Sequence, residues 1–256
     1  MIRLVASDID GTLLPYGGTA IPEEIFAEID RLAGKGILFC PASGRQYTSI
    51  RKLFAPVADR LPYICENGAA VYGPGSPGPV LGSTAMDREA ALALCRDIIA
   101  QPELEVFISG GDVSYLCPKY GEILPLVRDE VGNNTIVLSR PEEVPEDIVK
   151  VSAYCPMGTD WAAAELVPRW GGVFRAAVAG EVWLDFTLAD KGKGLTQLCA
   201  ALGIGLDQVM AFGDNFNDEA MLSLAGRPYL MESAAPALKA RFPVHCASVA
   251  DVLKTL

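Results

Sequence analysis

The sequence predicts an α/β protein, in which helices cover both faces of a parallel β-sheet and an α+β module is inserted into the chain. Continuous apolar runs alternate with amphipathic helical stretches near both ends of the 256-residue chain. This pattern is typical of parallel strands that are buried on both faces. Between the two blocks, strand-like segments occur in pairs separated by helices. Residues 73–79, rich in Gly and Pro, predict a turn-rich connector into this middle region.

The first block predicts three strands and two helices. The strands are expected at residues 2–7, 37–40 and 62–65, and the helices at residues 22–35 and 44–54. Proline at position 22 supports the start of the earlier helix, because the first turn does not need its missing N–H.

The alternation returns near the end of the chain. Helices are expected at residues 191–202, 215–225 and 249–256, and strands at residues 208–212 and 227–231. In the middle region, helices are expected at residues 87–100, 121–130 and 160–169, and strands at residues 104–109, 113–117, 135–138, 149–154, 173–177 and 182–186. We therefore expect a core domain from residues 1–80 and 189–256, with residues 81–188 inserted as an α+β domain.

Composition excludes several classes of protein. The net charge of −11, without a basic block, argues against nucleic acid or an anionic membrane as a partner. No apolar run approaches the roughly 20 residues that span a bilayer. Seven scattered cysteines without a C-x-x-C pair, and one histidine, support neither a zinc site nor a disulfide framework. With no secretory signal pattern, we expect a cytoplasmic protein with reduced thiols; the sequence leaves its oligomeric state open.

Two acids end the first predicted strand. Asp8 and Asp10 are two residues apart, so on an extended strand both point to the same side. Gly11 permits a sharp exit, and Thr12 adds a hydroxyl. Because neighbouring carboxylates repel, a divalent cation is the expected counter-charge. A plain Asp-Gly turn is the alternative.

Polar residues also follow the second strand and open a later helix. The hydroxyl of Ser43, with the backbone N–H groups that follow it in Gly44 and Arg45, can bind an anion at a helix start; a helix N-cap is the alternative. Lys191 stands at a helix N-terminus, where a cation is unfavourable. An anion between Lys191 and the acids would explain this placement; a solvated surface lysine is the alternative.

A fourth cluster follows the strand at residues 208–212. Residues 213–218 place several oxygen ligands close together, from Asp214, Asn217 and Asp218, and such ligands suit Mg²⁺. Capping of the following helix is the alternative for one Asp or Asn of this cluster. The carboxyl ends of parallel strands share one sheet edge, where ligands bind. We therefore expect the four clusters to meet there.

Together these motifs resemble those of the haloacid dehalogenase superfamily of phosphatases: Asp8-x-Asp10-Gly11-Thr12, Ser43-Gly44-Arg45, Lys191, and Gly213-Asp214-x-x-Asn217-Asp218. The place and texture of the insert resemble the C2-type cap of the Cof-like (IIB) branch. The segment Glu66-Asn67-Gly68-Ala69 is also typical of that branch. The resemblance covers the whole chain and implies a Rossmann-like core.

The resemblance implies a mechanism. Asp8 would attack phosphorus and form an aspartyl-phosphate, while Asp10 would move protons to the leaving group and from water. Mg²⁺ would be held by Asp8, the Asp10 backbone carbonyl and Asp214. The cap would close over the site and recognise the leaving group of the substrate.

The same resemblance assigns the remaining positions. Phosphate or substrate binding falls to Thr12, Ser43, Gly44, Arg45, Lys191 and Asn217. Asp218 would act indirectly, by orienting Lys191 or a water on the metal. The expected activity is Mg²⁺-dependent hydrolysis of a small-molecule phosphate monoester such as a sugar phosphate.

Three alternatives stay open at this point: a phosphomannomutase-like phosphotransferase, a mannosyl-3-phosphoglycerate or sucrose-phosphate type of sugar phosphatase, and a non-catalytic ligand-binding protein on the same scaffold. The loops of the cap, such as residues 110–112, carry no specificity pattern that identifies the substrate.

Overall fold

The computed structural model describes residues 1–15, 18–179 and 181–256. The chain forms two compact units. Unit 1 comprises Met1–Ser43, Ile50–Gly82 and Asp190–Leu256; unit 2 comprises Gly44–Ser49 and Ser83–Ala189. The predicted domain ranges include residues 16, 17 and 180, which lie outside the described residues. None of the described helices is both long and apolar enough to span a bilayer.

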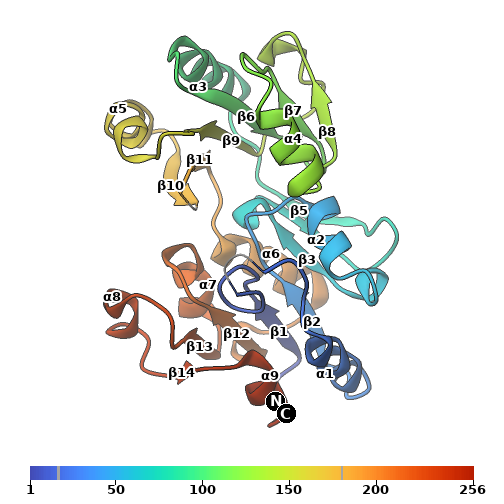
Figure 1. Ribbon diagram of the computed structural model, residues 1–256. Coiled ribbons are helices and arrows are strands. Elements are labelled where there is room, and N and C mark those ends of the chain that lie inside the picture. Colours follow the sequence, from blue (N-terminus) through green and yellow to red (C-terminus); the bar gives the residue numbers. More distant parts are fainter. Residues whose placement is uncertain (16–17, 180) are drawn as a thin grey trace. The chain divides into compact units, whose positions relative to one another are not determined.

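The central sheet of unit 1 is parallel throughout, as the sequence predicts (Figure 1). Its strand order is β14-β13-β12-β1-β2. The strands are β1 (Leu4–Ser7), β2 (Leu38–Pro41), β12 (Val209–Gly213), β13 (Arg227–Met231) and β14 (His245–Cys246). The short strand β14 is an edge strand that the sequence analysis did not predict.

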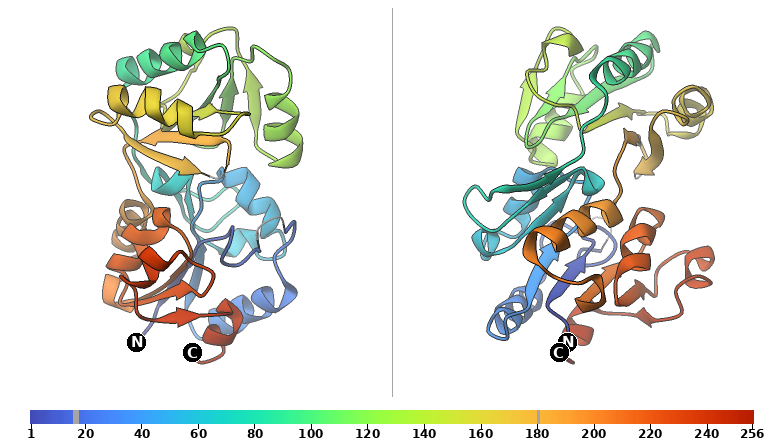
Figure 2. Two further views of the ribbon diagram at one scale, coloured as in Figure 1. Left: turned by 60° about the vertical axis from the view of Figure 1, so that its left-hand side comes forward. Right: turned by 180° about the vertical axis from the view of Figure 1, so that it is seen from behind.

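Helices pack on both faces of this sheet (Figures 1 and 2). The helices of unit 1 are α1 (Glu23–Ala33), α6 (Lys191–Leu202), α7 (Glu219–Leu224), α8 (Pro236–Lys239) and α9 (Val249–Leu253), and α2 (Tyr47–Leu53) begins in unit 2 and ends in unit 1. On one face, Leu4 and Ala6 of β1 pack with Leu195 of α6 in a continuous apolar core. On the opposite face, Phe39 of β2 packs against Phe54, with their ring centroids 6.3 Å apart. The alternating direction of strand side chains explains why both faces need cover.

The third predicted strand is not part of the parallel sheet. It forms β3 (Tyr63–Cys65), which pairs antiparallel with β4 (Ala70–Tyr72) in a separate three-stranded sheet that continues to β5 (Val80–Ser83). One parallel bridge, between Ala42 and Ile64, joins this small sheet to the end of β2. The expectation of a third parallel strand was wrong, because a short buried apolar run does not reveal the direction of its partner.

Several helices are shorter than predicted. The helix expected at residues 44–54 begins at Tyr47, and the segment expected at 215–225 starts as a 3₁₀ turn at Phe216–Asp218 before α7. Further 3₁₀ turns lie at Ala58–Arg60, Glu66–Gly68 and Leu206–Gln208. Helix α8 was not predicted.

Unit 2 contains a six-stranded sheet of order β10-β11-β9-β6-β7-β8, antiparallel except for the β7–β8 pair. Its strands are β6 (Glu105–Ser109), β7 (Ser114–Leu116), β8 (Thr135–Val137), β9 (Lys150–Tyr154), β10 (Arg175–Ala179) and β11 (Trp183–Thr187). Helices α3 (Arg88–Ala100) and α5 (Asp160–Trp170) pack on one face through an apolar core, and a 3₁₀ turn spans Pro141–Glu143.

The helix expected at residues 121–130 begins later and is irregular. It consists of α4 (Ile123–Pro125) followed by a π-helical turn at Leu126–Glu130. Because Pro125 has no N–H to donate to the carbonyl of residue 121, and its ring crowds that carbonyl, it disfavours a regular helix that starts at residue 121. The paired strands and helices of unit 2 confirm the α+β texture expected for the middle region.

Candidate active site

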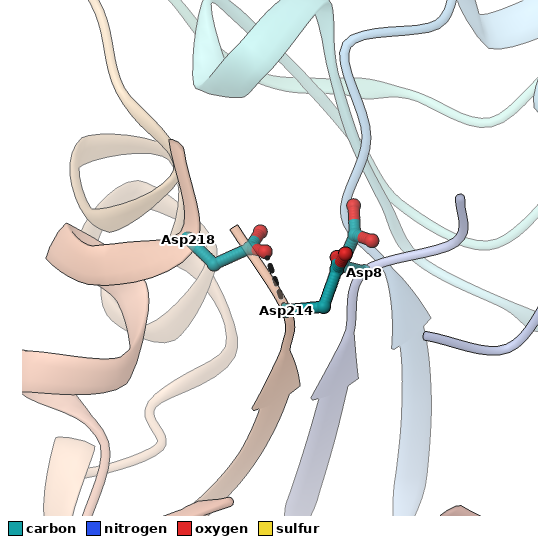
Figure 3. Close-up of side chains that lie close together, drawn as sticks. All are labelled: Asp8, Asp214 and Asp218. Atoms are coloured by element: carbon teal, nitrogen blue, oxygen red, sulfur yellow. Dashed lines mark hydrogen bonds between the residues drawn. The ribbon is translucent and has the colours of Figure 1, made fainter. Parts of the chain in front are cut away.

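Asp8 and Asp214 follow the ends of two neighbouring strands. Ser7, the last residue of β1, is in register with Phe212 of β12, and the backbone N–H of Asp8 donates to the Phe212 carbonyl at 3.0 Å. Strand β12 ends one residue later, so Asp214 emerges beside Asp8 (Figure 3). The pairing of β1 with β12 therefore brings together two acids that are more than 200 positions apart in the sequence.

A third acid completes a buried cluster. Carboxylate oxygens of Asp8, Asp214 and Asp218 all lie within 4.8 Å of one another, and all three residues are buried. Figure 3 shows Asp218 directed from the adjacent helical segment toward the two strand ends. Because three buried carboxylates repel, this arrangement needs a positive charge.

Lys191 supplies part of that charge. Its side chain is completely buried, and its Nζ donates hydrogen bonds to Asp8 Oδ1 and, at 2.6 Å, to Asp218 Oδ1. The alternative of a solvated surface lysine was therefore wrong. The lysine begins α6 and does not follow a strand of the parallel sheet, so it reaches the edge where the strands end from a helix and not from a strand end.

The electrostatics of the cluster are dominated by burial. Desolvation raises the pKa of Asp8 well above its usual range, the nearby Asp218 raises it further, and Lys191 opposes both effects. Burial alone would lower the pKa of Lys191, but Asp218 and Asp8 together raise it above its ordinary value. Lys191 is therefore a permanent cation at neutral pH, and charge on Asp8 is costly unless a further cation is present.

Asp218 organises the loop after β12. Its Oδ2 accepts from the backbone N–H groups of Asp214 at 3.0 Å and Asn215 at 3.1 Å, while Oδ1 contacts Lys191. Both oxygens are thus engaged by donors of the protein. The capping alternative holds for Asn215, whose side chain accepts from the N–H of Phe216.

The residues after Asp8 form a tight turn. The backbone N–H of Gly11, at a φ of 95°, donates to the Leu14 carbonyl at 2.7 Å. Thr12 Oγ1 donates to Asp214 Oδ1 at 3.3 Å, so the turn contacts the acidic cluster through its hydroxyl. The Asp10 side chain is partly exposed and is not among the three clustered carboxylates.

Ser43 lies in an extended connection and does not cap α2. Its backbone N–H donates to the Ile64 carbonyl at 2.9 Å, its carbonyl accepts from the N–H of Asn67 at 3.0 Å, and its side chain is buried. The helix begins only at Tyr47, so the N-cap alternative was wrong.

Gly44 and Arg45 open the short segment that belongs to unit 2. There the Gly44 carbonyl accepts from Lys150 Nζ at 3.2 Å. In the same unit, the Asp112 carboxylate accepts from the N–H and hydroxyl of Thr48 at 2.8 and 2.7 Å. The loop at residues 110–112, which carries no specificity pattern in the sequence, thus holds the start of α2 through Asp112.

Asn217 contacts a residue to which sequence reasoning gave no role. Its Nδ2 donates to Asn67 Oδ1 at 3.3 Å. In the sequence, Asn67 stands out only as part of the segment Glu66-Asn67-Gly68-Ala69, which is typical of the Cof-like branch. A sequence rule for residues that favour the left-handed conformation, Asn before Gly, would have drawn attention to it.

The donor set suits a hard divalent cation. Carboxylate oxygens of Asp8 and Asp214 lie within 4.8 Å of each other, and both residues are buried. Oxygen ligands of this kind are those that Mg²⁺ prefers. Because Asp218 already uses both oxygens, Asp8 and Asp214 are the side chains best placed to hold a metal ion.

Comparison with known proteins agrees with this geometry. A family model described as haloacid dehalogenase-like hydrolase matches residues 5–253. The chain belongs to the haloacid dehalogenase-like hydrolases. It is 27% identical over 249 residues to the 5-amino-6-(5-phospho-D-ribitylamino)uracil phosphatase of Escherichia coli, covering 93% of this chain and 88% of that protein. The expected class, a phosphatase of this superfamily, is confirmed.

Solved structures share the fold over nearly the full length. A crystal structure from Eubacterium rectale is 32% identical with a TM-score of 0.87, covering 99% of this chain and 98% of that one. A sugar phosphatase of haloacid dehalogenase subclass IIB is 21% identical with a TM-score of 0.81, covering 99% and 98% of the two chains. This second likeness concerns the fold alone, and it confirms the predicted architecture of a parallel-sheet core with an inserted α+β cap.

Proposed function

We propose that this protein is a Mg²⁺-dependent phosphatase that hydrolyses a small-molecule phosphate monoester through an aspartyl-phosphate on Asp8. One observation carries the proposal: Lys191, fully buried, contacts Asp8 through only one carboxylate oxygen. The other oxygen, Oδ2, has no hydrogen-bond partner among the described residues. A carboxylate held on one side and free of donors on the other is suited to attack phosphorus.

Mg²⁺ would be held by Asp8, the backbone carbonyl of Asp10 and Asp214, and when bound it would offset the repulsion between the nucleophile and the phosphate. Lys191 would remain protonated and hold a phosphoryl oxygen. Asp218 would orient Lys191 and the Asp214 backbone, which is the role its two engaged oxygens support.

The remaining residues act on protons and on the phosphoryl group. Asp10 would donate a proton to the leaving oxygen and then accept one from the attacking water. The phosphoryl oxygens would be held by the neutral donors of Ser43 and Asn217, and by Thr12, which also braces Asp214. Gly44 and Arg45 continue the Ser43 loop and are proposed to bind substrate.

The substrate is proposed to be a phosphorylated metabolite with a sugar-like or cofactor-like leaving group. The relative from Escherichia coli is named for a phosphorylated ribitylamino-uracil, which joins a polyol phosphate to a heterocycle. A panel of sugar phosphates, polyol phosphates, mannosyl-3-phosphoglycerate and pyridoxal phosphate, scored by kcat/KM, would rank these classes.

The proposal is tested by comparing Asp8→Asn with Asp251→Asn, an exposed aspartate of the same unit. We expect Asp8→Asn to lose at least roughly 10³-fold in p-nitrophenyl phosphate hydrolysis with Mg²⁺. Asp251→Asn should stay within about twofold of the parent, because its side chain lies at the surface. Rapid quenching of the parent should trap a hydroxylamine-sensitive phosphoenzyme that Asp8→Asn lacks. Parental turnover in Asp8→Asn would overturn the assignment.

Product analysis separates hydrolysis from phosphotransfer. With glucose 1-phosphate, a phosphatase releases inorganic phosphate, whereas a mutase returns glucose 6-phosphate. We expect free phosphate, since the named relative is a phosphatase. The absence of any Mg²⁺-dependent product across the panel would instead favour a non-catalytic ligand-binding protein.

A further inference from the structure

Three consecutive residues after β3 adopt the left-handed conformation. Glu66, Asn67 and Gly68 have φ values of 50°, 53° and 94°. Non-glycine residues rarely adopt this region, and runs of such residues persist only where surrounding contacts hold them. All three are buried, so the conformation is imposed by the packing inside unit 1.

The segment touches three regions of the proposed phosphate site. The Asn67 N–H donates to the Ser43 carbonyl at 3.0 Å, and Asn67 Oδ1 accepts from Asn217 Nδ2 at 3.3 Å. Gly68 lies against the chain just before Lys191.

The approach at Gly68 is very close. A Cβ added there would lie 2.0 Å from the Asp190 carbonyl oxygen and 3.1 Å from the Lys191 nitrogen. On the next turn of α6, a Cβ at Gly194 would lie 2.7 Å from the Gly68 Cα. The start of α6 and residues 66–68 therefore fit together with no space for side chains between them.

We propose that Asn67 is a positioning residue that holds Ser43 and Asn217 together for phosphate binding; this inference rests on the proposed function. Ser43 is held through its backbone carbonyl. Asn217 is exposed, so without an anchor its side chain would rotate among several rotamers. Asn67 is buried and itself fixed by the left-handed turn, which makes it a rigid anchor.

The contact also sets which end of the Asn217 amide faces the substrate. One N–H of Asn217 Nδ2 is donated to Asn67 Oδ1, which leaves the second N–H for a phosphoryl oxygen. If the amide were flipped, two carbonyl oxygens would oppose each other, and the flipped state is therefore disfavoured. Asn67 thus favours the orientation that presents a donor to an anion.

The turn explains why this residue is asparagine. Asparagine is among the residues that best tolerate the left-handed region, and it also carries the acceptor that Asn217 requires. Glycine would keep the backbone conformation but lose the acceptor. Alanine would lose the acceptor and strain the backbone.

Asn67→Gly is therefore the informative variant, because it preserves the turn and the N–H to Ser43 while removing the side chain that accepts from Asn217. We expect kcat/KM for p-nitrophenyl phosphate with Mg²⁺ to fall about 10-fold, and the inhibition constant for inorganic phosphate to rise, with Tm close to that of the parent. Ala69→Gly is the matched control: Ala69 lies in the same turn at a φ of −76°, and its methyl group offers Ser43 and Asn217 no hydrogen-bonding atom. It should leave kcat/KM within about twofold while lowering Tm.

A double-mutant cycle distinguishes positioning from a general structural role. In the Asn217→Ala background, Asn67→Gly should change kcat/KM by less than about twofold, because the residue through which it acts is absent. Equal losses in both backgrounds, or a parental kcat/KM and phosphate inhibition constant in Asn67→Gly, would overturn the inference. A parent without Mg²⁺-dependent phosphate release would instead overturn the proposed function, and this inference with it.

Discussion

Lys191 Nζ lies 2.6 Å from Asp218 Oδ1, and neither side chain is exposed to solvent. Removing two charges from water is expensive, and their attraction offsets this cost only with good geometry and further hydrogen bonds. Asp218 meets that condition through the two backbone N–H groups on its other oxygen. The pair therefore belongs to a connected network that joins the start of α6 to the loop after β12.

Lys191→Met is predicted to remove both activity and stability. It leaves three buried carboxylates without their ammonium partner, and breaking a buried pair typically costs about 3–5 kcal/mol of unfolding free energy. Urea denaturation in EDTA measures this loss. Lys193→Met, two residues along the same helix and exposed, is the control and should change the unfolding free energy by less than about 0.5 kcal/mol. Similar stabilities for the two variants would contradict the interpretation.

Asp8→Asn is predicted to make the metal-free protein more stable than the parent, by a margin that grows as pH rises. Burial, reinforced by Asp218, raises the pKa of folded Asp8 above its value in the unfolded chain. The folded state therefore holds this proton more strongly, and the parent loses stability as pH rises from the unfolded pKa through the raised folded pKa. Urea denaturation in EDTA between pH 4 and pH 8 should show the difference, variant minus parent, growing with pH. If the stability difference shrinks as pH rises, the attraction of Lys191 outweighs burial, and the pKa of folded Asp8 is lowered and not raised.

Magnesium is predicted to raise Tm in a manner that requires Asp214. A ligand that binds only the folded state stabilises it by about 2.7 kcal/mol at 100 times its dissociation constant. Thermal unfolding across a MgCl₂ series should show this rise in the parent and lose it in Asp214→Asn. The control Asp251→Asn should keep the parental shift. An equal shift in Asp214→Asn would place the ion elsewhere.

Gly68→Ala is predicted to destabilise the protein far more than Gly36→Ala. Both glycines have positive φ, 94° and 74°, but a Cβ at Gly36 meets nothing within 4 Å. Gly36→Ala should therefore cost only about 1 kcal/mol of unfolding free energy, from backbone conformation. Gly68→Ala adds a direct overlap with the Asp190 carbonyl and should cost at least about 3 kcal/mol or prevent folding. Equal costs, measured by urea denaturation or soluble yield, would show that the Gly68 contact can relax.

The cysteines are predicted to react slowly with a thiol reagent in the folded protein. All seven are free, and burial raises the pKa of Cys95 to about 12 and of Cys117 to about 11. Since the thiolate is the reactive form, little of it exists at pH 8. Labelling with an aromatic disulfide should be slow, with the half-buried Cys117 reacting first, and should reach all seven after unfolding in guanidinium. Fast labelling of several thiols in the native state would contradict the packing.

Much of the fold and of the acidic cluster could be predicted from the sequence alone. Apolar runs that end in Asp8 and Asp214 predicted two strands with their acids at one sheet edge, because apolar runs alternating with helices are typical of a parallel sheet, whose strands end at a shared edge. The residue pattern also located Lys191 at a helix start, where an anionic partner was one explanation for a cation and a solvated surface lysine the other.

The sequence could not decide which partners these residues find. The strand at Tyr63–Cys65 left the parallel sheet because pairing direction depends on a distant partner, here Ala70–Tyr72. Asn67 became a neighbour of Ser43 and Asn217 only through tertiary packing.

The residue types and their spacing thus determined the chemistry of this protein: oxygen ligands at strand ends, a lysine at a helix start and a turn that carries a hydroxyl. Only the tertiary structure decided that Lys191 is fully buried between Asp8 and Asp218, and that Asn67 joins Ser43 to Asn217. The physical reason is that local sequence sets backbone conformation and side-chain direction. Burial and pairing, which set the charge state and orientation of the site, depend on contacts between segments more than 200 residues apart.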